Sequence, residues 1–413
     1  MTSNKYILKK ITFLETFNFF LLALYPIALI IGNLIINITI LLFTVSFLIN
    51  LKKNKIYLNQ NFFYLLIFFF ISLLINLFMS ANFENSFPRI IKIFFIIIFV
   101  FEIQRVIQND KFGYMKFVYF LWFLTFVILT IDIIFEIFMG YNFLGISSII
   151  PGRIASFFGD ELVVGAYYHG FVLIFLSYLI FQKSKIYVLI FSIITVLLIS
   201  FYIGERSNFI KLFLSVILFS SFAIKVDFKI KLFAILLTLT TITTVVNFNE
   251  HYKLRYYYQI KTLFSQDGYS KYMKDSLYGA HQNAAYKIFK ENFYFGVGVK
   301  NFRYEVWDEK YENKEYTQTH RRYSTHPHQI HYEFLSETGI FGYLSFLVFI
   351  LFSLYLAIKS YFKTKNLYQL AGIIFVITSL LPIIPSGSFL STFASGIFWF
   401  NYALMAGFVK TKF

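Results

Sequence analysis

Long apolar runs recur along almost the whole chain, and they constrain its fold more than any other feature. Runs of about 17–25 residues can cross a hydrocarbon core of about 30 Å as helices. Only 14% of the residues are charged and 58% are hydrophobic, whereas soluble domains carry about 25% charged residues. No run alternates as a membrane barrel strand does, and helices satisfy their backbone polar groups internally. The sequence therefore predicts an all-α polytopic membrane protein.

Run lengths predict about twelve transmembrane helices. We expect nine in residues 1–247, a large outward-facing loop subdomain in residues 248–332 between spans nine and ten, and three more in residues 333–413. The first span follows a basic start but lacks a small-x-small cleavage site, so we interpret it as an uncleaved helix. The predicted spans are 11–31, 34–50, 62–80, 88–104, 114–138, 164–182, 186–203, 208–224, 231–247, 333–358, 367–384 and 389–409.

The distribution of Lys and Arg predicts the orientation of these spans. About half of the 37 Lys and Arg residues fall in short connections that share one side of this arrangement. Short loops rich in Lys and Arg are cytoplasmic. We therefore expect a multi-pass protein of the cytoplasmic (inner) membrane with both termini in the cytoplasm. The net charge of +16 follows partly from this topology, and no nucleic-acid-binding module is recognisable, so no nucleic-acid partner is expected.

Three segments on the predicted outer side are informative. They are the link at 140–164, the turn GERSN at 204–208 and the long polar segment at 248–332. A connection this long is usually functional or disordered. The long segment contains amphipathic stretches such as AAYKIFKENF, so we expect a small helical subdomain on the outer face.

Arg206 in GERSN lies where two apolar runs meet. An ionisable residue at such a position suggests a buried partner or an anionic ligand. The alternatives are an arginine that reaches the lipid headgroups, or one that is neutralised by Glu205. Lys211, one turn further on, is a second cation that either adds to a positive pocket or reaches the headgroups.

The link at 140–164 carries Arg153 and the neighbouring acids Asp160 and Glu161. Paired acids can perform acid–base chemistry when their environments separate their pKa values. The alternative favoured here is structural, because Asp160 precedes an apolar run and has the chemistry of a helix N-cap.

The stretch STHPHQIHYEFLSETGIFGYLSF, residues 324–346, concentrates three of the seven histidines. His326, His328 and His331 could form a metal site with Glu333 or Glu337, since imidazole and carboxylate both bind zinc. They could instead form a structural cluster that caps the next helix. A third interpretation is that one histidine is a general base, because neutral imidazole accepts protons near neutral pH.

Four segments of the chain carry a resemblance to a known family. In chain order they are RIASFFGDELVVGAY, GERSN, ENFYFGVGVKNFR and THPHQIHYEFLSETGIFG. Together they resemble the O-antigen ligase and O-antigen polymerase superfamily. Gln329 stands where that family commonly has Asn, and Phe293 where Pro is common. Many members also carry an Arg ahead of the amphipathic helix, where this chain offers Tyr278 or His281.

The resemblance implies an enzyme that moves a glycan from an undecaprenyl diphosphate carrier to an acceptor hydroxyl at the periplasmic face. The acceptor would be a lipid A core or another glycan, and no cofactor or metal is implied. His328 would be the base, with His326 as the second candidate. The diphosphate would be held by arginines, and the candidates are Arg206, Arg303, Arg255 and Arg153.

The sequence leaves several functional alternatives open. A polymerase would join lipid-linked repeat units with the same machinery as a ligase. A lipid-linked glycan flippase or transporter usually shows two similar halves, which this chain lacks. A purely structural anchoring protein would leave the arginines and histidines unexplained. Tyr256, Tyr257, Tyr258 and Trp307 would either stack on sugars or form an interfacial aromatic belt.

Overall fold

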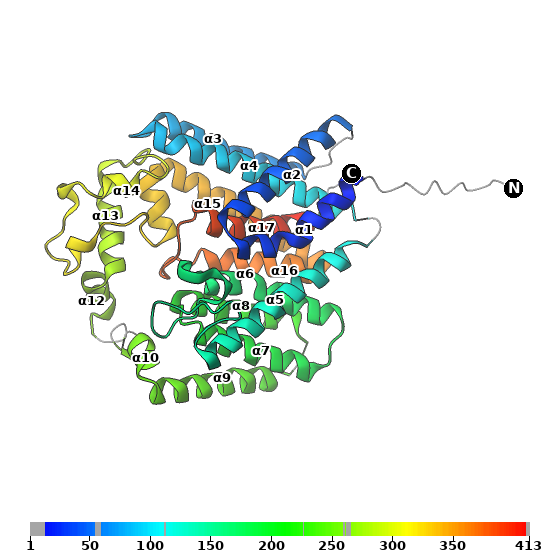
Figure 1. Ribbon diagram of the computed structural model, residues 1–413. Coiled ribbons are helices and arrows are strands. Elements are labelled where there is room, and N and C mark those ends of the chain that lie inside the picture. The colour runs from blue at the N-terminus through cyan, green and yellow to red at the C-terminus, as the bar shows by residue number, and fades with distance from the viewer. Residues whose placement is uncertain are drawn as a thin grey trace.

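A computed structural model describes residues 13–53, 59–110, 113–225, 227–258, 261 and 266–409, and these residues form helices and loops without a strand (Figure 1). Some of the Lys residues in the short basic connections that predict the topology, among them Lys9, Lys55 and Lys410, lie outside the described residues. The long helices are α1 (Phe13–Ile31), α2 (Asn33–Lys53), α3 (Gln60–Phe78), α4 (Phe83–Gln108), α5 (Met115–Met139), α6 (Val164–Phe181), α7 (Ile186–Tyr202), α8 (Arg206–Ala223), α9 (Phe228–Phe248), α15 (Ile330–Thr364), α16 (Leu367–Ser379) and α17 (Thr392–Gly407).

These helices confirm an all-α polytopic membrane protein. Eight of the described helices are long and apolar enough to cross a membrane, and α7 and α16 are shorter apolar helices. Each of the predicted spans contains a helix. That all of them cross the bilayer remains a prediction, because α4 carries several charged residues and α17 has only 16 residues.

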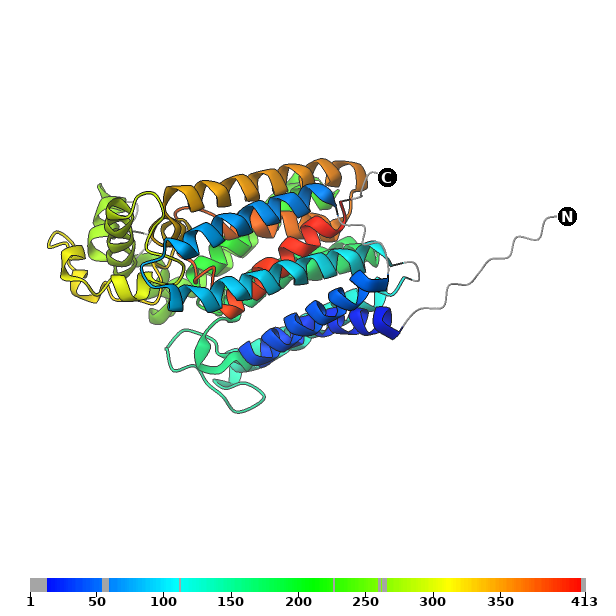
Figure 2. The same cartoon turned by 90° about the horizontal axis from the view of Figure 1, so that it is seen from above.

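The centre of the bundle is formed by the C-terminal helices. α17 is buried along almost its whole length, and it packs against α16 and α4. α16 also contacts α6 and α8, whereas α3 packs along α15. α9 lies at the periphery, where only Ala234, Thr238 and Val246 are buried, and its contacts are with α7 and the short segments that follow it (Figures 1 and 2).

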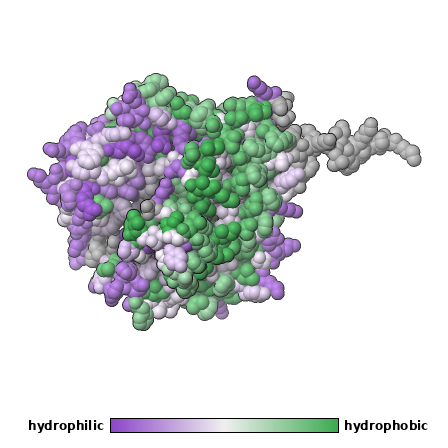
Figure 3. All heavy atoms as spheres, in the orientation of Figure 1, coloured by the Kyte–Doolittle hydropathy of each residue, from purple (hydrophilic) through white to green (hydrophobic). Residues whose placement is uncertain are grey.

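The segment between α9 and α15 covers one end of the bundle, and the start of α1 and the end of α17 lie toward the other (Figure 1). Hydrophilic residues gather over this covered end, next to a broad hydrophobic band over the helices (Figure 3). The predicted amphipathic helix is present as α13. The elements of this cap are α10 (Glu250–Tyr252), η2 (Lys253–Tyr257), α12 (Gly268–Asp275), α13 (Leu277–Glu291), α14 (Phe302–Glu305), η3 (Glu309–Tyr311) and η4 (Thr319–Arg321).

A break in α15 joins this cap to the bundle. Gly339 has φ 63° and ψ −169°, a conformation open essentially to glycine alone. The helical hydrogen bonds lost there are replaced by the segment 293–298. Val297 and Gly298 N–H donate to the carbonyls of Ser336 (3.0 Å) and Glu337 (2.8 Å), while Ile340 N–H donates to the carbonyl of Phe293 (2.8 Å).

Two glycines make this close crossing possible. A Cβ on Gly339 would clash with the backbone of Tyr294 and Phe295, and one on Gly296 would clash with the backbone of Glu337 and Thr338. The Asn76 side chain on α3 completes the junction, donating to the Phe295 carbonyl at 2.6 Å. The crossing fixes where the next residues, including Lys300 and Arg303, enter the bundle.

Candidate active site

Three of the predicted arginines meet in one pocket at the end of α7 and the start of α8. The cavity has a volume of about 150 Å³. Glu205 is the only acid among its lining residues, so positive charge dominates. The lining residues are Arg153, Gly204, Glu205, Arg206, Ser207, Asn208, Arg255, Tyr278, Pro385, Ser386 and Gly387.

Backbone carbonyls hold the three guanidinium groups of this arginine pocket. Arg206 donates to the Arg255 carbonyl at 2.9 Å, and Arg255 donates to the Gly204 carbonyl at 2.9 Å. Arg153 donates to the Leu162 carbonyl at 2.9 Å and pairs with Glu205 at 3.2 Å. The buried Nε atoms of Arg153 and Arg255 have no hydrogen-bond partner among the described residues. The guanidinium groups therefore keep donors available for an anion.

The first turn of α8 adds to the positive potential. Glu205 occupies its N-cap position without a side-chain capping bond, so N–H groups of the first turn stay open. Its carboxylate instead accepts from Gly165 N–H at 3.1 Å and from the Asn208 amide at 2.6 Å. Helix N-termini attract anions through these free N–H groups and the helix dipole.

The link that carries Arg153 is anchored by two acids of α5 that the sequence analysis did not single out. Asp132 accepts from the Ser156 hydroxyl at 2.6 Å, and Glu136 accepts from Ala155 N–H at 2.9 Å. The prediction that Asp160 caps α6 is wrong. The N-cap of α6 is Val163, and residues 156–161 form a separate 3₁₀ turn.

His328 borders the arginine pocket. Tyr278 and Ser386, which line the pocket, both contact it: the ring centroids of Tyr278 and His328 lie 5.1 Å apart, and Ser386 N–H donates to the His328 carbonyl at 2.8 Å. His281 stacks on the His328 ring at 5.1 Å. His328 has a φ of 56°, which is uncommon for a non-glycine residue and occurs often at functional sites.

The three histidines of the motif have different surroundings. His331 is structural, because its ring nitrogens lie 2.9 Å from the Leu380 carbonyl and 3.0 Å from the Tyr343 hydroxyl. Neither ring nitrogen of His328 is hydrogen-bonded to another described residue. His326 Nδ1 lies 3.0 Å from the Thr325 hydroxyl, and its buried Nε2 has no partner in the described part of the chain.

The alternatives for this cluster find little support in the geometry. The side chain of Gln329, not a histidine, caps α15 by accepting from His331 and Tyr332 N–H. Within the described ranges, no group of three or more His, Asp or Glu side chains is arranged to hold a metal ion. Glu333 is instead buried, accepting from the Ser388 hydroxyl and from Phe389 N–H at 2.8 Å.

His326 and His328 are neutral at physiological pH. Burial, together with charge repulsion from His281, lowers the pKa of His328 to about 4. Burial, together with charge repulsion from His328, Lys300 and other groups, lowers the pKa of His326 to about 2. A neutral imidazole can accept a proton. His328 is the better base of the two because its pKa is lowered less.

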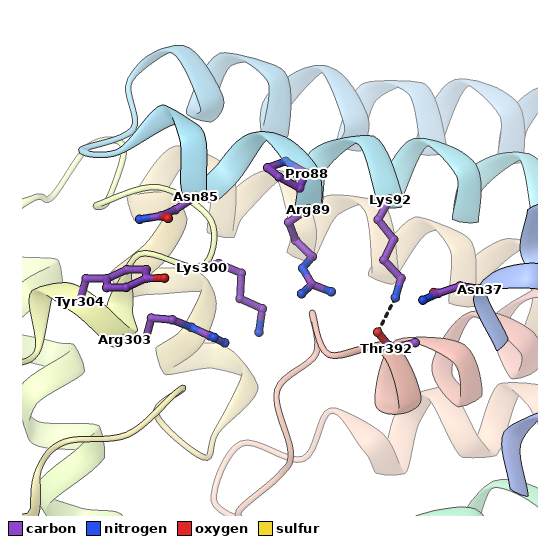
Figure 4. Close-up of a pocket in the computed structure, with 9 residues that line it drawn as sticks. All are labelled: Asn37, Asn85, Pro88, Arg89, Lys92, Lys300, Arg303, Tyr304 and Thr392. Atoms are coloured by element: carbon purple, nitrogen blue, oxygen red, sulfur yellow. Dashed lines mark hydrogen bonds between the residues drawn. The ribbon is translucent and has the colours of Figure 1, made fainter. Parts of the chain in front are cut away.

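Arg303 lies apart from the other predicted arginines, in a second cavity of about 300 Å³ (Figure 4). Arg89 and Lys92 from α4 and Lys300 from the crossing segment point into the same space. The sequence analysis missed these three. Arg89 and Lys92 lie inside a predicted span, where a cation is a functional signal by itself, whereas Lys300 lies in the long polar segment and carries no such signal. The lining residues are Asn37, Asn85, Pro88, Arg89, Lys92, Lys300, Arg303, Tyr304 and Thr392.

The aromatic residues considered for sugar stacking differ in their exposure. Tyr256 is buried, and its hydroxyl donates to the Phe201 carbonyl at 3.2 Å, so its role is structural. Trp307 is exposed and stacks on Tyr323 with a centroid distance of 4.0 Å. The pair offers a flat apolar surface on the polar cap.

The fold and the site define a polytopic membrane protein with a cationic, histidine-containing site beside its polar cap. A family model described as O-Antigen ligase matches residues 165–347, which span GERSN, the segment 293–298 and the histidine motif. Over these residues the chain is similar to the O-antigen ligase superfamily, whose members are membrane glycosyltransferase-like enzymes. No curated protein shows significant similarity to the chain.

Proposed function

We propose that this protein transfers a glycan from a polyprenyl diphosphate carrier, such as undecaprenyl diphosphate, to an acceptor hydroxyl on the outer side of the cytoplasmic membrane. The observation that carries the proposal is the arginine pocket beside His328. It combines Arg153, Arg206 and Arg255 with the N-terminus of α8, and its lining residues contact the histidine. Diphosphate recognition and proton abstraction are thereby combined in one site.

The charges of the pocket suit a diphosphate leaving group. Arginine binds phosphate oxygens through a fixed fork of donors. As the bond between the anomeric carbon and the diphosphate oxygen breaks, negative charge grows on that oxygen. Arg206 and Arg255 would stabilise it, because preorganised donors stabilise charge that develops in a transition state. Arg153, already paired with Glu205, would help to fix the position of the pocket.

His328 would accept the proton of the attacking hydroxyl. The acceptor oxygen forms a bond to the anomeric carbon, its proton passes to a ring nitrogen of His328, and the diphosphate departs with the bonding electrons. The resulting imidazolium lies beside the anionic leaving group, which favours the charged ring. His326 is the second candidate for this role. Since arginines supply the countercharge, we propose that the transfer is independent of metal ions.

The position of the pocket suits a lipid-linked donor. It combines Arg255 of the polar cap with Arg206 at the start of the apolar helix α8, so a diphosphate could be bound there while its polyprenyl chain stays in the bilayer. A ligase would present a lipid A core as acceptor, whereas a polymerase would present a second lipid-linked repeat unit. The matched family supports a membrane function of this ligase and polymerase class, and we propose the ligase role first.

The test is glycan transfer by the purified protein in detergent with a polyprenyl diphosphate glycan as donor. The acceptor is either a lipid A core or a second donor molecule. We expect product from wild type in the presence of EDTA, and loss of product with His328→Ala and Arg206→Ala. His320→Ala, at an exposed turn of the cap, is the matched control.

Each opposite result identifies a specific error. Full activity of His328→Ala would exclude this residue as the base. Loss of activity with EDTA would refute metal independence. Translocation of the carrier across vesicles without glycan transfer would favour a flippase instead.

A further inference from the structure

The second cavity, which we call the α4 pocket, is defined by Arg89, Lys92, Lys300 and Arg303. It shares no lining residue with the arginine pocket. All four side chains point toward one space, two from the first turns of α4 and two from the segment that follows the crossing at Gly296 (Figure 4). None of its lining residues is an acid.

The charges of the α4 pocket are only partly compensated. The side chains of Arg89 and Arg303 make no hydrogen bond or ion pair with any other described residue, and the buried Nε of Arg303 lacks a partner there. Lys92 donates to the neutral Thr392 hydroxyl at 2.5 Å and forms no ion pair with a described acid. Lys300 has an acid 3.9 Å away in Glu333 and also donates to Ser388 at 2.6 Å. Partly buried cations that repel one another are costly without a counter-ion.

The neighbouring surface indicates what kind of anion fits. On α4, the large side chains of Phe83, Phe87, Ile91 and Phe94 are exposed. This spacing puts them on one stripe of the helix, on the face roughly opposite Arg89 and Lys92, which face the pocket. On α2, Leu34 and Leu41 are exposed and lie three residues before and four residues after Asn37, which lines the pocket. Residues at these spacings share one face of a helix, so a molecule with hydrocarbon chains could lie against this face of α2 while its head group enters the pocket.

The α4 pocket is also close to the histidines. Lys300 and Arg303 lie near enough to His326 for their charges to lower its pKa, and the rings of His326 and His328 are 4.1 Å apart. The two cationic pockets thus lie beside the two neighbouring histidines, one next to His328 and the other next to His326.

We propose that the α4 pocket binds a phosphate of a membrane-anchored acceptor lipid, so that the protein holds the phosphates of two lipids at once. The inference rests on the proposed function, which places the donor diphosphate in the arginine pocket. The acceptor phosphate would fix the acceptor glycan so that its hydroxyl reaches the base. Both acceptor classes, a phosphorylated glycolipid and a second polyprenyl diphosphate glycan, present such a phosphate.

The first experiment measures binding without transfer. Wild type, Arg89→Gln/Lys92→Gln and the matched control Lys314→Gln, an exposed cation of the cap, are titrated in nanodiscs without donor. The ligands are lipid A, its dephosphorylated form and undecaprenyl diphosphate. We expect the double variant to bind the preferred phosphorylated lipid about 10-fold or more weakly, as for loss of charge-assisted hydrogen bonds. Arg89→Lys, which keeps the charge, should retain part of the affinity and shows that the fold tolerates substitution.

The second experiment separates acceptor from donor kinetically. The double variant should raise KM for the acceptor about 10-fold or more and leave KM for the donor within about twofold. Dephosphorylation of the acceptor should weaken wild type and leave the variant unchanged, because both changes remove the same contact. The acceptor that responds, lipid A core or polyprenyl diphosphate glycan, identifies the source of the phosphate.

Failure of this inference is distinguishable from failure of the proposed function. If wild type transfers glycan and the double variant keeps its acceptor KM and lipid affinity, only the α4 pocket assignment is wrong. If the variant raises KM for the donor instead, the α4 pocket binds the donor diphosphate. If wild type transfers no glycan to either acceptor, the proposed function fails, and the binding titration still decides whether the α4 pocket takes a lipid phosphate.

Discussion

The histidines and arginines of the site differ chiefly in which of their hydrogen-bonding atoms have no partner among the described residues. His331 uses both ring nitrogens in structural contacts, whereas those of His328 stay unbonded by other described residues. Arg206 and Arg255 are held by backbone carbonyls, which fix their positions without cancelling their charge. Free functional groups in a fixed frame are what catalysis by preorganised electrostatics requires.

The lowered pKa of His328 predicts an unusual pH profile. An ordinary histidine has a pKa of about 6.5, whereas that of His328 is lowered to about 4. The neutral base is therefore present at every pH above about 4 in the free enzyme. We expect kcat/KM, which reports the free enzyme, to fall only as the pH drops to about 4. The acid limb of the kcat profile should lie at a higher pH, because bound diphosphate favours the imidazolium and so raises the pKa of His328 in the complex.

The pH dependence is measured as initial rates of transfer between pH 3.5 and 8. His320→Gln, a change at an exposed turn, should leave both limbs in place. A kcat/KM limb at pH 6.5 would mean that the base is an unshifted group rather than His328.

The geometry of Arg206 predicts that a lysine is a poor substitute. Its guanidinium group donates to the Arg255 carbonyl at 2.9 Å and also faces the pocket. A lysine would supply a point charge without the fork of several N–H donors that a guanidinium group has. We expect Arg206→Lys to reduce kcat about 10-fold and Arg206→Ala about 100-fold or more, in the range seen when a transition-state donor is removed. The kcat values are measured as transfer rates at saturating donor. Lys271→Gln, on the exposed surface of α12, is the control. Equal activity of Arg206→Lys and wild type would contradict the predicted need for a guanidinium group.

Among the elements, the broken helix α15 has the largest influence on the site. Its break at Gly339 exposes carbonyls that accept from Val297 and Gly298, and this places Lys300 and Arg303 at the α4 pocket. Asn76 on α3 holds the same junction. A continuous helix would satisfy its own hydrogen bonds and leave the crossing segment without partners.

The crossing predicts a strong effect of Gly339→Ala. The backbone conformation at Gly339 costs a non-glycine residue about 1–3 kcal/mol, and the added Cβ would clash with the backbone of Tyr294 and Phe295. We expect a lower midpoint of thermal unfolding in detergent together with loss of transfer. Gly113→Ala is the control, because Gly113 also has a positive φ but open space around a Cβ. Equal unfolding midpoints for the two variants would show that the close crossing does not contribute to the stability of the fold.

For the whole molecule, the arrangement separates a polar cap from the end that carries the short basic connections. Lys314 lies in the cap and Lys363 at the end of α15, and both are exposed. The chain contains no cysteine. Single substitutions therefore report on topology without background.

We expect Lys314→Cys to react with a membrane-impermeant maleimide in spheroplasts. Lys363→Cys should react only after permeabilisation, because Lys/Arg-rich connections stay in the cytoplasm. Labelling is read as a mass shift. The opposite pattern would place the cap and the arginine pocket in the cytoplasm and overturn the proposed periplasmic site.

The fold class, the approximate positions of the long helices and the resemblance to the O-antigen ligase superfamily follow from the sequence alone. These are properties of local composition, since hydrophobic runs and short motifs are legible without knowing which segments meet. The sequence also indicated His328 and Arg206, because polar residues in an apolar chain are costly and therefore conspicuous. The capping role of Asp160 was predicted wrongly because helix boundaries depend on loop packing that local patterns do not encode.

Which cations lie together depends on the tertiary structure. Arg303 and Arg255 were equal candidates as partners of Arg206, and the fold brings Arg255 to it while placing Arg303 with Arg89 and Lys92. Residues 89 and 303 are far apart in the chain, and their meeting depends on the break at Gly339. Long-range packing of this kind arises from the whole bundle, and no local pattern in the sequence specifies it.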